Sequence, residues 1–325
     1  MIIGNKEFDL NNHCYIMGIL NVTPDSFSDG GKYNNLDAAL KHTEEMIRDG
    51  ADIIDVGGES TRPGHTVISE EEEIARVTPV IEAIKKNFDV PISIDTYKGT
   101  VTLAALQAGA DLVNDIWGFK HDQKVAEYTA KYNAACCLMH NRNEAVYDDF
   151  QKDFIRDLRE CIAIAKKANV PDDKIMLDPG VGFGKTYEMN LEIINHLEIM
   201  KQLNYPILLG TSRKSVIGLT LDLPANERVE GTLATTVIGV MKGCSFVRVH
   251  DVKECVQITK IAKKLKIHEY KVGLYMDAVR NTETARLRAA ADRCREADVM
   301  MKTSRLDYIA LERLICTIPS KAGAK

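Results

Sequence analysis

Polar and charged residues recur in this sequence at the places where short apolar runs end. Asp55 lies inside such a run, Asp95 directly follows another, and similar runs end at an amide, a lysine or a histidine. Carboxylates, amides and ammonium groups together suit a flat, nitrogen-rich ring, because they can accept and donate several hydrogen bonds at its edge. The residues at these positions are Asn21, Asp55, Asp95, Asn114, Asp178, Lys214, Arg248 and His250.

The cations among these residues also suit an anion. Arg62, Arg248 and His250, together with the Asn21 amide, fit a phosphate group, which the guanidinium fork of an arginine contacts in a bidentate manner. Each residue taken singly has an ordinary alternative. Lys214 also fits a solvated surface lysine, and His250 a strand-end histidine whose ring is already hydrogen-bonded.

The stretch 175–185 contains an apolar run that ends at Asp178 and is followed by Gly180, Gly182 and Gly184. A buried carboxylate requires partners, and glycines allow close backbone approach or a positive φ. The spacing matches neither the Walker A pattern, which needs a glycine where Pro179 stands, nor Gly-x-Gly-x-x-Gly. A nucleotide-binding loop is therefore excluded, and an ordinary turn at a strand end is the alternative to a ligand site.

Apolar runs alternate with helical segments along most of the chain. This alternation is typical of βα units in a parallel sheet that is buried on both faces. The runs span residues 16–20, 53–56, 92–94, 112–113, 135–139, 175–178, 206–209 and 246–251. Eight units in roughly 250 residues predict a closed (β/α)₈ TIM barrel, whose site lies at the carboxyl ends of the strands. A doubly wound open sheet is the competitor.

The overall composition is that of an ordinary globular protein. The 325 residues are 45% hydrophobic and 27% charged, and the net charge of −5 gives no general attraction for nucleic acid or anionic membranes. The sequence has no run of about 18 apolar residues and no signal-peptide pattern. Its eight cysteines are scattered without a C-x-x-C pair, which is typical of reduced cysteines. We therefore predict a cytoplasmic protein with no membrane or nucleic-acid partner.

Two of the polar loops resemble the two signatures of dihydropteroate synthase. They span residues 21–31 and 57–64, and further motifs follow in the order of that family at 93–96, 138–140, 178–185, 212–215 and 248–251. The resemblance covers about residues 12 to 267. It implies a (β/α)₈ barrel of folate biosynthesis that joins 7,8-dihydropterin-6-ylmethyl diphosphate to 4-aminobenzoate and releases diphosphate. It further implies Mg²⁺ as cofactor, a homodimer and a sulfonamide target.

The resemblance implies a role for each residue that matches a motif. Asn21 would bind Mg²⁺, and Asp55 would lie near the metal or near Arg248. The pterin would be held by Asp95, Asn114, Asp178 and Lys214, in a slot lined by Met139 and Phe183. The diphosphate would be bound by Thr61, Arg248 and His250. Two loops would close over the site and form the aminobenzoate pocket together with Ser215. These loops contain Phe27, Asp29, Arg62 and Pro63.

The chemistry of the resemblance fits these residue types. Departure of diphosphate leaves an electron-poor methylene on the pterin, which buried carboxylates stabilise while cations stabilise the leaving group. Closing loops exclude water, and no general base is needed because an arylamine is already nucleophilic. Residues that act on the reacting groups would be Asp55, Asp95, Lys214, Arg248 and Arg62.

Two other functions stay open. A methyltransferase barrel that uses methyltetrahydrofolate would share Asp95, Asn114 and Asp178 but would not need the loop that contains Arg62. A pterin-binding regulator would keep the pocket without turnover. The presence of Asn21, Arg62, Lys214 and Arg248 favours the enzyme.

The chain changes character near residue 269, which predicts a barrel over 1–268 and a helical extension over 269–325. Residues 282–303 have the spacing of an amphipathic helix, and a second helix is predicted from Leu306 to about Ile318, before Pro319. Residues 291–298 and 311–314 resemble the C-terminal helices of clamp-loader delta subunits. The extension is interpreted either as a helical hairpin packed on the barrel or dimer surface, or as a basic stripe that binds a partner.

Overall fold

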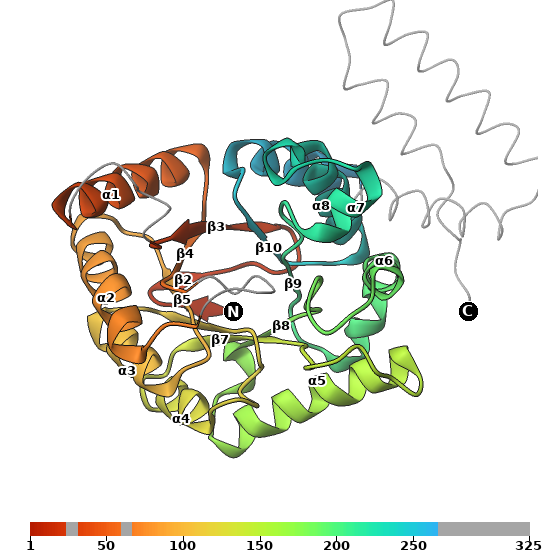
Figure 1. Cartoon of the computed structure of the whole chain (residues 1–325), viewed down its shortest axis with the longest axis horizontal. Helices are drawn as coiled ribbons and strands as arrows, with labels where there is room; N and C mark the ends of the chain where they lie inside the picture. The colour runs from red at the N-terminus through yellow and green to blue at the C-terminus, as the bar shows by residue number, and fades with distance from the viewer. Residues whose placement is uncertain (24–31, 60–66, 266–325) are drawn as a thin grey trace, which may run out of the picture. The chain divides into compact units, whose positions relative to one another are not determined.

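Eight parallel strands form a ring with helices around it (Figure 1). The computed structural model describes residues 1–23, 32–59 and 67–265, and Met1–Lys264 form one compact unit. The strands are β3 (Tyr15–Asn21), β4 (Ile53–Gly57), β5 (Ile92–Asp95), β6 (Leu112–Asp115), β7 (Ala135–Met139), β8 (Ile175–Asp178), β9 (Leu208–Leu209) and β10 (Phe246–Val249). The helices are α1 (Lys32–Asp49), α2 (Glu70–Asn87), α3 (Gly99–Ala108), α4 (Gln123–Lys131), α5 (Phe150–Lys167), α6 (Tyr187–Asn195), α7 (Ser215–Leu221), α8 (Val229–Lys242) and residues 252–265.

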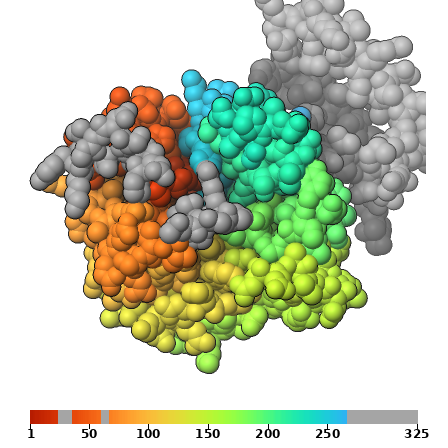
Figure 2. Space-filling view, viewed as in Figure 1, coloured from red at the N-terminus to blue at the C-terminus, as the bar shows by residue number. Residues whose placement is uncertain are grey.

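The sheet closes on itself. Its strand order is β8-β7-β6-β5-β4-β3-β10-β9, and a parallel bridge between Leu177 and Ile207 joins the two outer strands. The Leu177 N–H donates to the Pro206 carbonyl oxygen at 2.9 Å in the same place. The segments follow one another around the ring, so that the last described residues lie beside the first helix (Figure 2). The predicted (β/α)₈ barrel is confirmed, and the open-sheet alternative is wrong.

The barrel interior has an apolar layer below and a polar layer above. Successive side chains of a strand point to opposite faces, so residues two apart share the interior. The inward residue switches from apolar to polar between Leu112 and Asn114 in β6, and between Met176 and Asp178 in β8. The lower layer consists of Met17, Ile53, Leu112, Ala135, Cys137, Met176, Leu208 and Phe246. The strand ends therefore carry polar side chains into one mouth.

A short hairpin closes the lower end of the barrel. Strands β1 (Ile2–Ile3) and β2 (Lys6–Glu7) pair antiparallel, and in Figure 1 they lie within the ring of strands. Ile3 and Phe8 are buried in the same cluster as the lower layer, with the Phe8 ring 5.7 Å from that of Phe246. The hairpin could not be predicted from the sequence, because strands of two residues are too short to show a periodicity.

The helix signals in the sequence behave as expected. The Ser69 side chain accepts a hydrogen bond from the Glu72 N–H at the start of α2, whose first turn is acidic. Helix α3 ends at Gly109, which has a φ of 111° that favours glycine. The seventh βα unit contains two helices, because the short α7 precedes α8.

Within the described ranges no helix is both long and apolar enough to cross a membrane. Cys136, Cys137, Cys161 and Cys255 are buried and form no disulfide. The predicted helical extension lies outside the described residues.

Candidate active site

Arg248 bridges two carboxylates at the centre of the barrel. Its Nε donates to Asp55 Oδ2 at 2.6 Å and its Nη2 donates to Asp95 Oδ2 at 2.6 Å. The Asn114 amide also approaches Asp55 Oδ2, at 3.4 Å. Residues from β4, β5, β6 and β10 thus meet because all four strands point one polar side chain into the upper layer. A buried guanidinium requires such partners, since desolvation of an unpaired charge is costly.

The two carboxylates keep unused acceptors. Asp55 Oδ1, Asp95 Oδ1 and the neighbouring Ser93 Oγ are buried and have no hydrogen-bond partner among the described residues. Burial raises the pKa of Asp95 to about 7, although Arg248 acts in the opposite direction. Buried acceptors are normally satisfied, so an unpaired carboxylate oxygen beside a mouth is an acceptor available to a ligand.

Asp178 and Lys214 lie on the other side of the same mouth. A methyl group on Gly210, which follows β9, would be 3.5 Å from Asp178 Oδ2 and 3.8 Å from Lys214 Nζ. It would also be 3.8 Å from the Arg248 Cβ. Burial raises the pKa of Asp178 and lowers the pKa of Lys214 to about 8. The glycine therefore leaves open the space into which these three side chains extend.

The backbone conformation of the loop 179–185 requires glycine at three positions. Gly180, Gly182 and Gly184 have φ values of 67°, 87° and 54°, which strain any other residue. A methyl group on Gly180 would be 1.9 Å from the His140 carbonyl oxygen, and one on Gly184 would be 2.6 Å from that of Arg142. The Gly180 N–H donates to Asp178 Oδ1 at 2.6 Å. The three glycines, whose spacing does not match a nucleotide-binding motif, thus allow the loop to pack closely against the end of β7.

An apolar cluster borders the polar groups. Met139 and Phe183, which the resemblance placed in the pterin slot, form one cluster with Tyr97, Ile116 and Trp117. The Lys214 Nζ lies 4.8 Å from the centre of the Phe183 ring. We did not predict Tyr97, Ile116 or Trp117. Tyr97 and Ile116 each lie two residues beyond a predicted polar strand end, and because side chains two apart in a strand share a face, this spacing could have indicated them.

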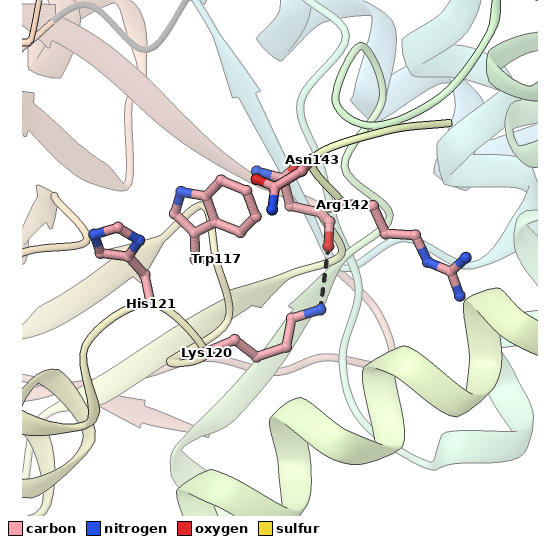
Figure 3. Close-up of a pocket in the computed structure, with 6 residues that line it drawn as sticks. Trp117, Lys120, His121, Arg142 and Asn143 are labelled. Atoms are coloured by element: carbon pink, nitrogen blue, oxygen red, sulfur yellow. Dashed lines mark hydrogen bonds between the residues drawn. The ribbon is translucent and has the colours of Figure 1, made fainter. Parts of the chain in front are cut away.

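A hollow of about 360 Å³ lies beside this cluster. Figure 3 shows Trp117 and Asn143 together, while Lys120 donates to the Asn141 carbonyl oxygen at 3.1 Å. The Arg142 guanidinium points away from them (Figure 3), and Arg142 Nε donates to Asp157 Oδ2 at 2.6 Å. The hollow is lined by Trp117, Lys120, His121, Asn141, Arg142 and Asn143. No residue that we predicted to bind substrate is in this set.

A hydrogen bond and an ion pair connect the loops after β9 and β10. Ser212 Oγ lies 3.0 Å from His250 Nδ1, and the Arg213 guanidinium binds both oxygens of Asp251, at 3.0 and 2.5 Å. These contacts place His250 and Lys214 on one rim. Ser215, which begins α7, is exposed on the same rim.

Asn21 lies near Asp95 at the mouth. A methyl group on Gly57 would lie 3.6 Å from Asn21 Oδ1 and 3.8 Å from Asp95 Oδ2. The amide oxygen of Asn21 and a carboxylate oxygen of Asp95 therefore face the same space above β4.

Five of the predicted residues, namely Phe27, Asp29, Thr61, Arg62 and Pro63, lie outside the described residues. A buried ion cluster next to the second of these segments was not predicted. Lys98 Nζ lies 2.6 Å from Glu59 and 2.8 Å from Glu73, and it also donates to the Ile68 carbonyl oxygen at 2.9 Å. The cluster thus ties residues 59 and 68, on either side of segment 60–66, to α2 and α3.

Comparison with known proteins decides the family. Residues 17–250 match the family model of pterin binding enzymes. A dihydropteroate synthase of Clostridium beijerinckii is 65% identical over 255 residues, which are 78% of this chain and 95% of that protein. This chain belongs to the dihydropteroate synthase family of pterin-binding enzymes.

Solved structures of the family agree with the fold. A dihydropteroate synthase from Clostridium difficile, crystallised in the presence of pteroic acid, is 50% identical with a TM-score of 0.78, covering 80% of this chain and 99% of that one. The dihydropteroate synthase of Yersinia pestis, in complex with a sulfonamide drug, is 42% identical with a TM-score of 0.77, covering 82% and 98%. The resemblance on which the predicted roles rest is therefore confirmed.

The end of the chain matches a second family model. Residues 247–318 match the C-terminal domain of the DNA polymerase III delta subunit. The match begins within β10 and overlaps the last positions of the pterin-binding match. The predicted resemblance of the extension to delta subunits is thus confirmed at the level of sequence similarity.

Proposed function

We propose that the chain joins 7,8-dihydropterin-6-ylmethyl diphosphate to 4-aminobenzoate, giving 7,8-dihydropteroate and diphosphate. This is a transferase reaction of folate biosynthesis, and it is the activity after which the family is named. The observation that supports it most directly is the mouth of the barrel. There, buried carboxylates with unused oxygens lie with Lys214 and Arg248 beside an apolar cluster.

The carboxylates and Lys214 would hold the pterin by its edge. Asp95 Oδ1 has no hydrogen-bond partner within the described ranges, and Asp178 Oδ2 faces the open space at Gly210. Both oxygens can accept N–H bonds from an aminopyrimidine, to which Lys214 and Asn114 can donate. Met139 and Phe183 would cover the ring faces. The pteroic acid present with the Clostridium difficile structure has the same ring system, which supports this assignment.

The diphosphate would be bound by Thr61, Arg248 and His250. The guanidinium of Arg248 is already paired with Asp55 and Asp95, so it acts as a fixed positive charge at the mouth. Fixed charges stabilise a leaving group without reorganisation during the reaction. Arg62 and Pro63, with Phe27, Asp29 and Ser215, would enclose the arylamine.

The donors at the mouth fit Mg²⁺. Asn21 Oδ1 and the unpaired Oδ1 of Asp55 are hard oxygen ligands. No cluster of three or more His, Cys, Asp and Glu side chains that could hold a metal occurs in the described part of the chain. Mg²⁺ usually takes one or two carboxylates from a protein and completes its shell with water and substrate phosphate. Bound there, Mg²⁺ would neutralise the charge of the leaving diphosphate.

In the reaction, the bond between the pterin methylene carbon and the diphosphate oxygen breaks, and the electron pair leaves with diphosphate. The lone pair of the arylamine nitrogen forms the new carbon–nitrogen bond, and that nitrogen then releases a proton to solvent. Asp95 and Asp178 stabilise the positive charge that develops on the ring. The apolar cluster around Phe183 keeps water from one face of the slot.

We infer that residues 1–268 are the enzyme and that residues 269–325 are a separate helical extension. The family match ends at residue 250, and the compact unit ends at Lys264. The delta-subunit match supports a helical character for the extension. We also propose a cytoplasmic homodimer, the state that the family resemblance implies, and the disulfide-free thiols of Cys136, Cys137, Cys161 and Cys255 support the cytoplasmic assignment. The drug bound to the Yersinia pestis relative supports a sulfonamide target.

Diphosphate release tests the proposed reaction. The chain is incubated with the pterin diphosphate and Mg²⁺, with and without 4-aminobenzoate, and diphosphate and dihydropteroate are measured. Release that depends on 4-aminobenzoate and matches the dihydropteroate formed is expected. Tight pterin binding without release would instead indicate a regulator, and a chain that binds neither compound would contradict the assignment.

A further inference from the structure

Lys185 is a partly buried lysine that the reaction does not use. Its Nζ lies 2.8 Å from His140 Nδ1, 2.9 Å from the Gly180 carbonyl oxygen and 3.0 Å from the Phe183 carbonyl oxygen. Three acceptors match the three hydrogens of an ammonium group. Burial lowers the pKa of Lys185, and the charge of Asp178 acts against this shift. The ammonium thus takes the place of water as the donor to two carbonyls of the loop 179–185.

His140 connects this lysine to an ion pair on α5. The ring is fully buried, and burial lowers the pKa of His140 to about 4, so it is neutral at physiological pH. Because Nδ1 accepts from Lys185, the hydrogen of the neutral ring is on Nε2, which lies 3.2 Å from Asp157 Oδ2. The same oxygen accepts from Arg142 Nε at 2.6 Å, on the side of Arg142 that points away from the hollow in Figure 3.

The loop that Lys185 holds carries part of the pterin slot. The Gly180 peptide accepts from Lys185 through its oxygen and donates to Asp178 Oδ1 through its N–H. Phe183, whose carbonyl oxygen also accepts from Lys185, belongs to the apolar cluster with Met139 and Trp117.

Further contacts fix the other peptides of this loop. Lys214 donates to the Val181 carbonyl oxygen at 2.6 Å, and Tyr147 Oη donates to that of Gly184 at 2.6 Å. The Gly182 N–H donates to Asn190 Oδ1 at 2.6 Å. The orientation of Asp178 and the place of Phe183 are therefore linked to the contacts of Lys185.

We propose that Lys185, supported by His140 and Asp157, is a positioning residue that holds the loop 179–185 in the shape required to bind the pterin. This inference rests on the proposed function. It predicts a selective effect, because the hydrogen bonds of the Lys185 ammonium group all go to the pterin side of the site, within the part of the chain that the structure describes. Loss of Lys185 weakens pterin binding and leaves the response to 4-aminobenzoate unchanged.

The test compares Lys185→Met with Lys120→Met. The positive charge of Lys120 contributes to lowering the pKa of Lys185, and Lys120 donates to the Asn141 carbonyl oxygen instead of to the loop 179–185 among the residues that the structure describes. Its variant therefore controls for the loss of a nearby positive charge. Trp117 is the only tryptophan of the chain and lies in the cluster with Phe183. Its fluorescence therefore reports pterin binding, which is titrated with the pterin diphosphate, and the KM for 4-aminobenzoate is measured at saturating pterin.

We expect the pterin Kd of Lys185→Met to rise about 10- to 100-fold, as for loss of hydrogen bonds from a charged group. The Lys120→Met variant keeps the wild-type Kd, and the KM for 4-aminobenzoate is unchanged in both. If Lys185→Met does not fold, the pterin Kd of His140→Asn tests the inference instead. It leaves an amide oxygen to accept from Lys185 but removes the link to Asp157, so its pterin Kd rises by a smaller factor.

A wild-type pterin Kd in the folded variant overturns the inference, and so does an equal rise of the pterin Kd and the arylamine KM, which indicates a general loss of structure. A wild-type chain that does not bind the pterin contradicts the proposed function instead.

Discussion

The Arg248 guanidinium and the Asp55 carboxylate meet at 2.6 Å inside the barrel, although 193 positions separate them in the chain. Strands β10 and β4 both flank β3, so barrel closure is what brings the two side chains together. The pair belongs to a polar upper layer in which Asp55, Asp95 and Asp178 are balanced by Arg248 and Lys214. The site is therefore a set of buried charges that the fold must stabilise before any substrate binds.

Removal of the central cation should cost stability. We predict that Arg248→Met lowers the free energy of unfolding by about 3 kcal/mol, because Asp55 and Asp95 remain buried without their partner. Urea unfolding measures the change. Arg156→Met is the control, since the exposed Arg156 pairs with Asp153, which keeps a second partner in Arg142. Its loss should cost less than about 1 kcal/mol. Equal losses in the two variants would show that the central cluster does not depend on Arg248.

The pterin step should weaken in alkaline solution. Burial lowers the pKa of Lys214 to about 8, so above that pH the amine loses the proton that makes it a full donor. We predict that kcat/KM for the pterin diphosphate falls as pH rises through about 8. Lys214→Arg should keep its charge and move the decline to higher pH. A decline at the same pH in both proteins would assign it to another group.

The free energy of unfolding also depends on the ionisation of Lys214, but it should rise with pH where kcat/KM falls. The folded state gives up the Lys214 proton at about pH 8, but the unfolded chain keeps it until about 10.5. The unfolded state therefore binds more protons between these values, and stability rises with pH there. Relative to Lys214→Met, the wild type should gain stability over this interval in urea unfolding measured at several pH values.

Two glycines of the same loop should differ in their tolerance of alanine. Both have positive φ, which alone costs an alanine about 1–2 kcal/mol. At Gly182 the added methyl group meets only Lys214 Cδ at 3.5 Å, but at Gly180 it overlaps the His140 carbonyl oxygen. We predict that Gly182→Ala loses about 1–2 kcal/mol and that Gly180→Ala loses more than about 4 kcal/mol. Chemical denaturation of both variants is the measurement, and a similar loss in both would mean that the loop moves freely.

The extension should be dispensable for the reaction. A protein that ends at residue 268 contains the compact unit Met1–Lys264 and the whole pterin-binding match. We predict that its kcat and both KM values stay within about twofold of the full chain, because a domain keeps its own core. A large loss of activity with retained folding would show that residues 269–325 contribute to the site.

Much of the fold could be predicted because its signal is local. Each apolar run corresponds to a strand, and Ser69 and Gly109 mark helix ends through their own backbone chemistry. Convergence of Asp95, Asn114 and Asp178 also follows, since the carboxyl ends of parallel strands share one face. The resemblance to a known family then gave each of them a role.

The contacts inside the barrel could not be predicted in the same way. Which carboxylates Arg248 bridges depends on barrel closure, and the burial of Lys185 depends on His140, 45 positions away. The hairpin of β1 and β2 depends on filling the lower end of the barrel with Ile3 and Phe8. These features arise from packing between distant segments and leave no periodic trace in the sequence.

The most direct test of the account is a crystal structure of the full chain with the pterin substrate or pteroate bound. The account predicts the aminopyrimidine edge at hydrogen-bonding distance, about 3 Å, from Asp95 and Asp178, with the ring against Met139 and Phe183. A pterin ring bound elsewhere, for example in the hollow lined by Lys120 and His121, would contradict it.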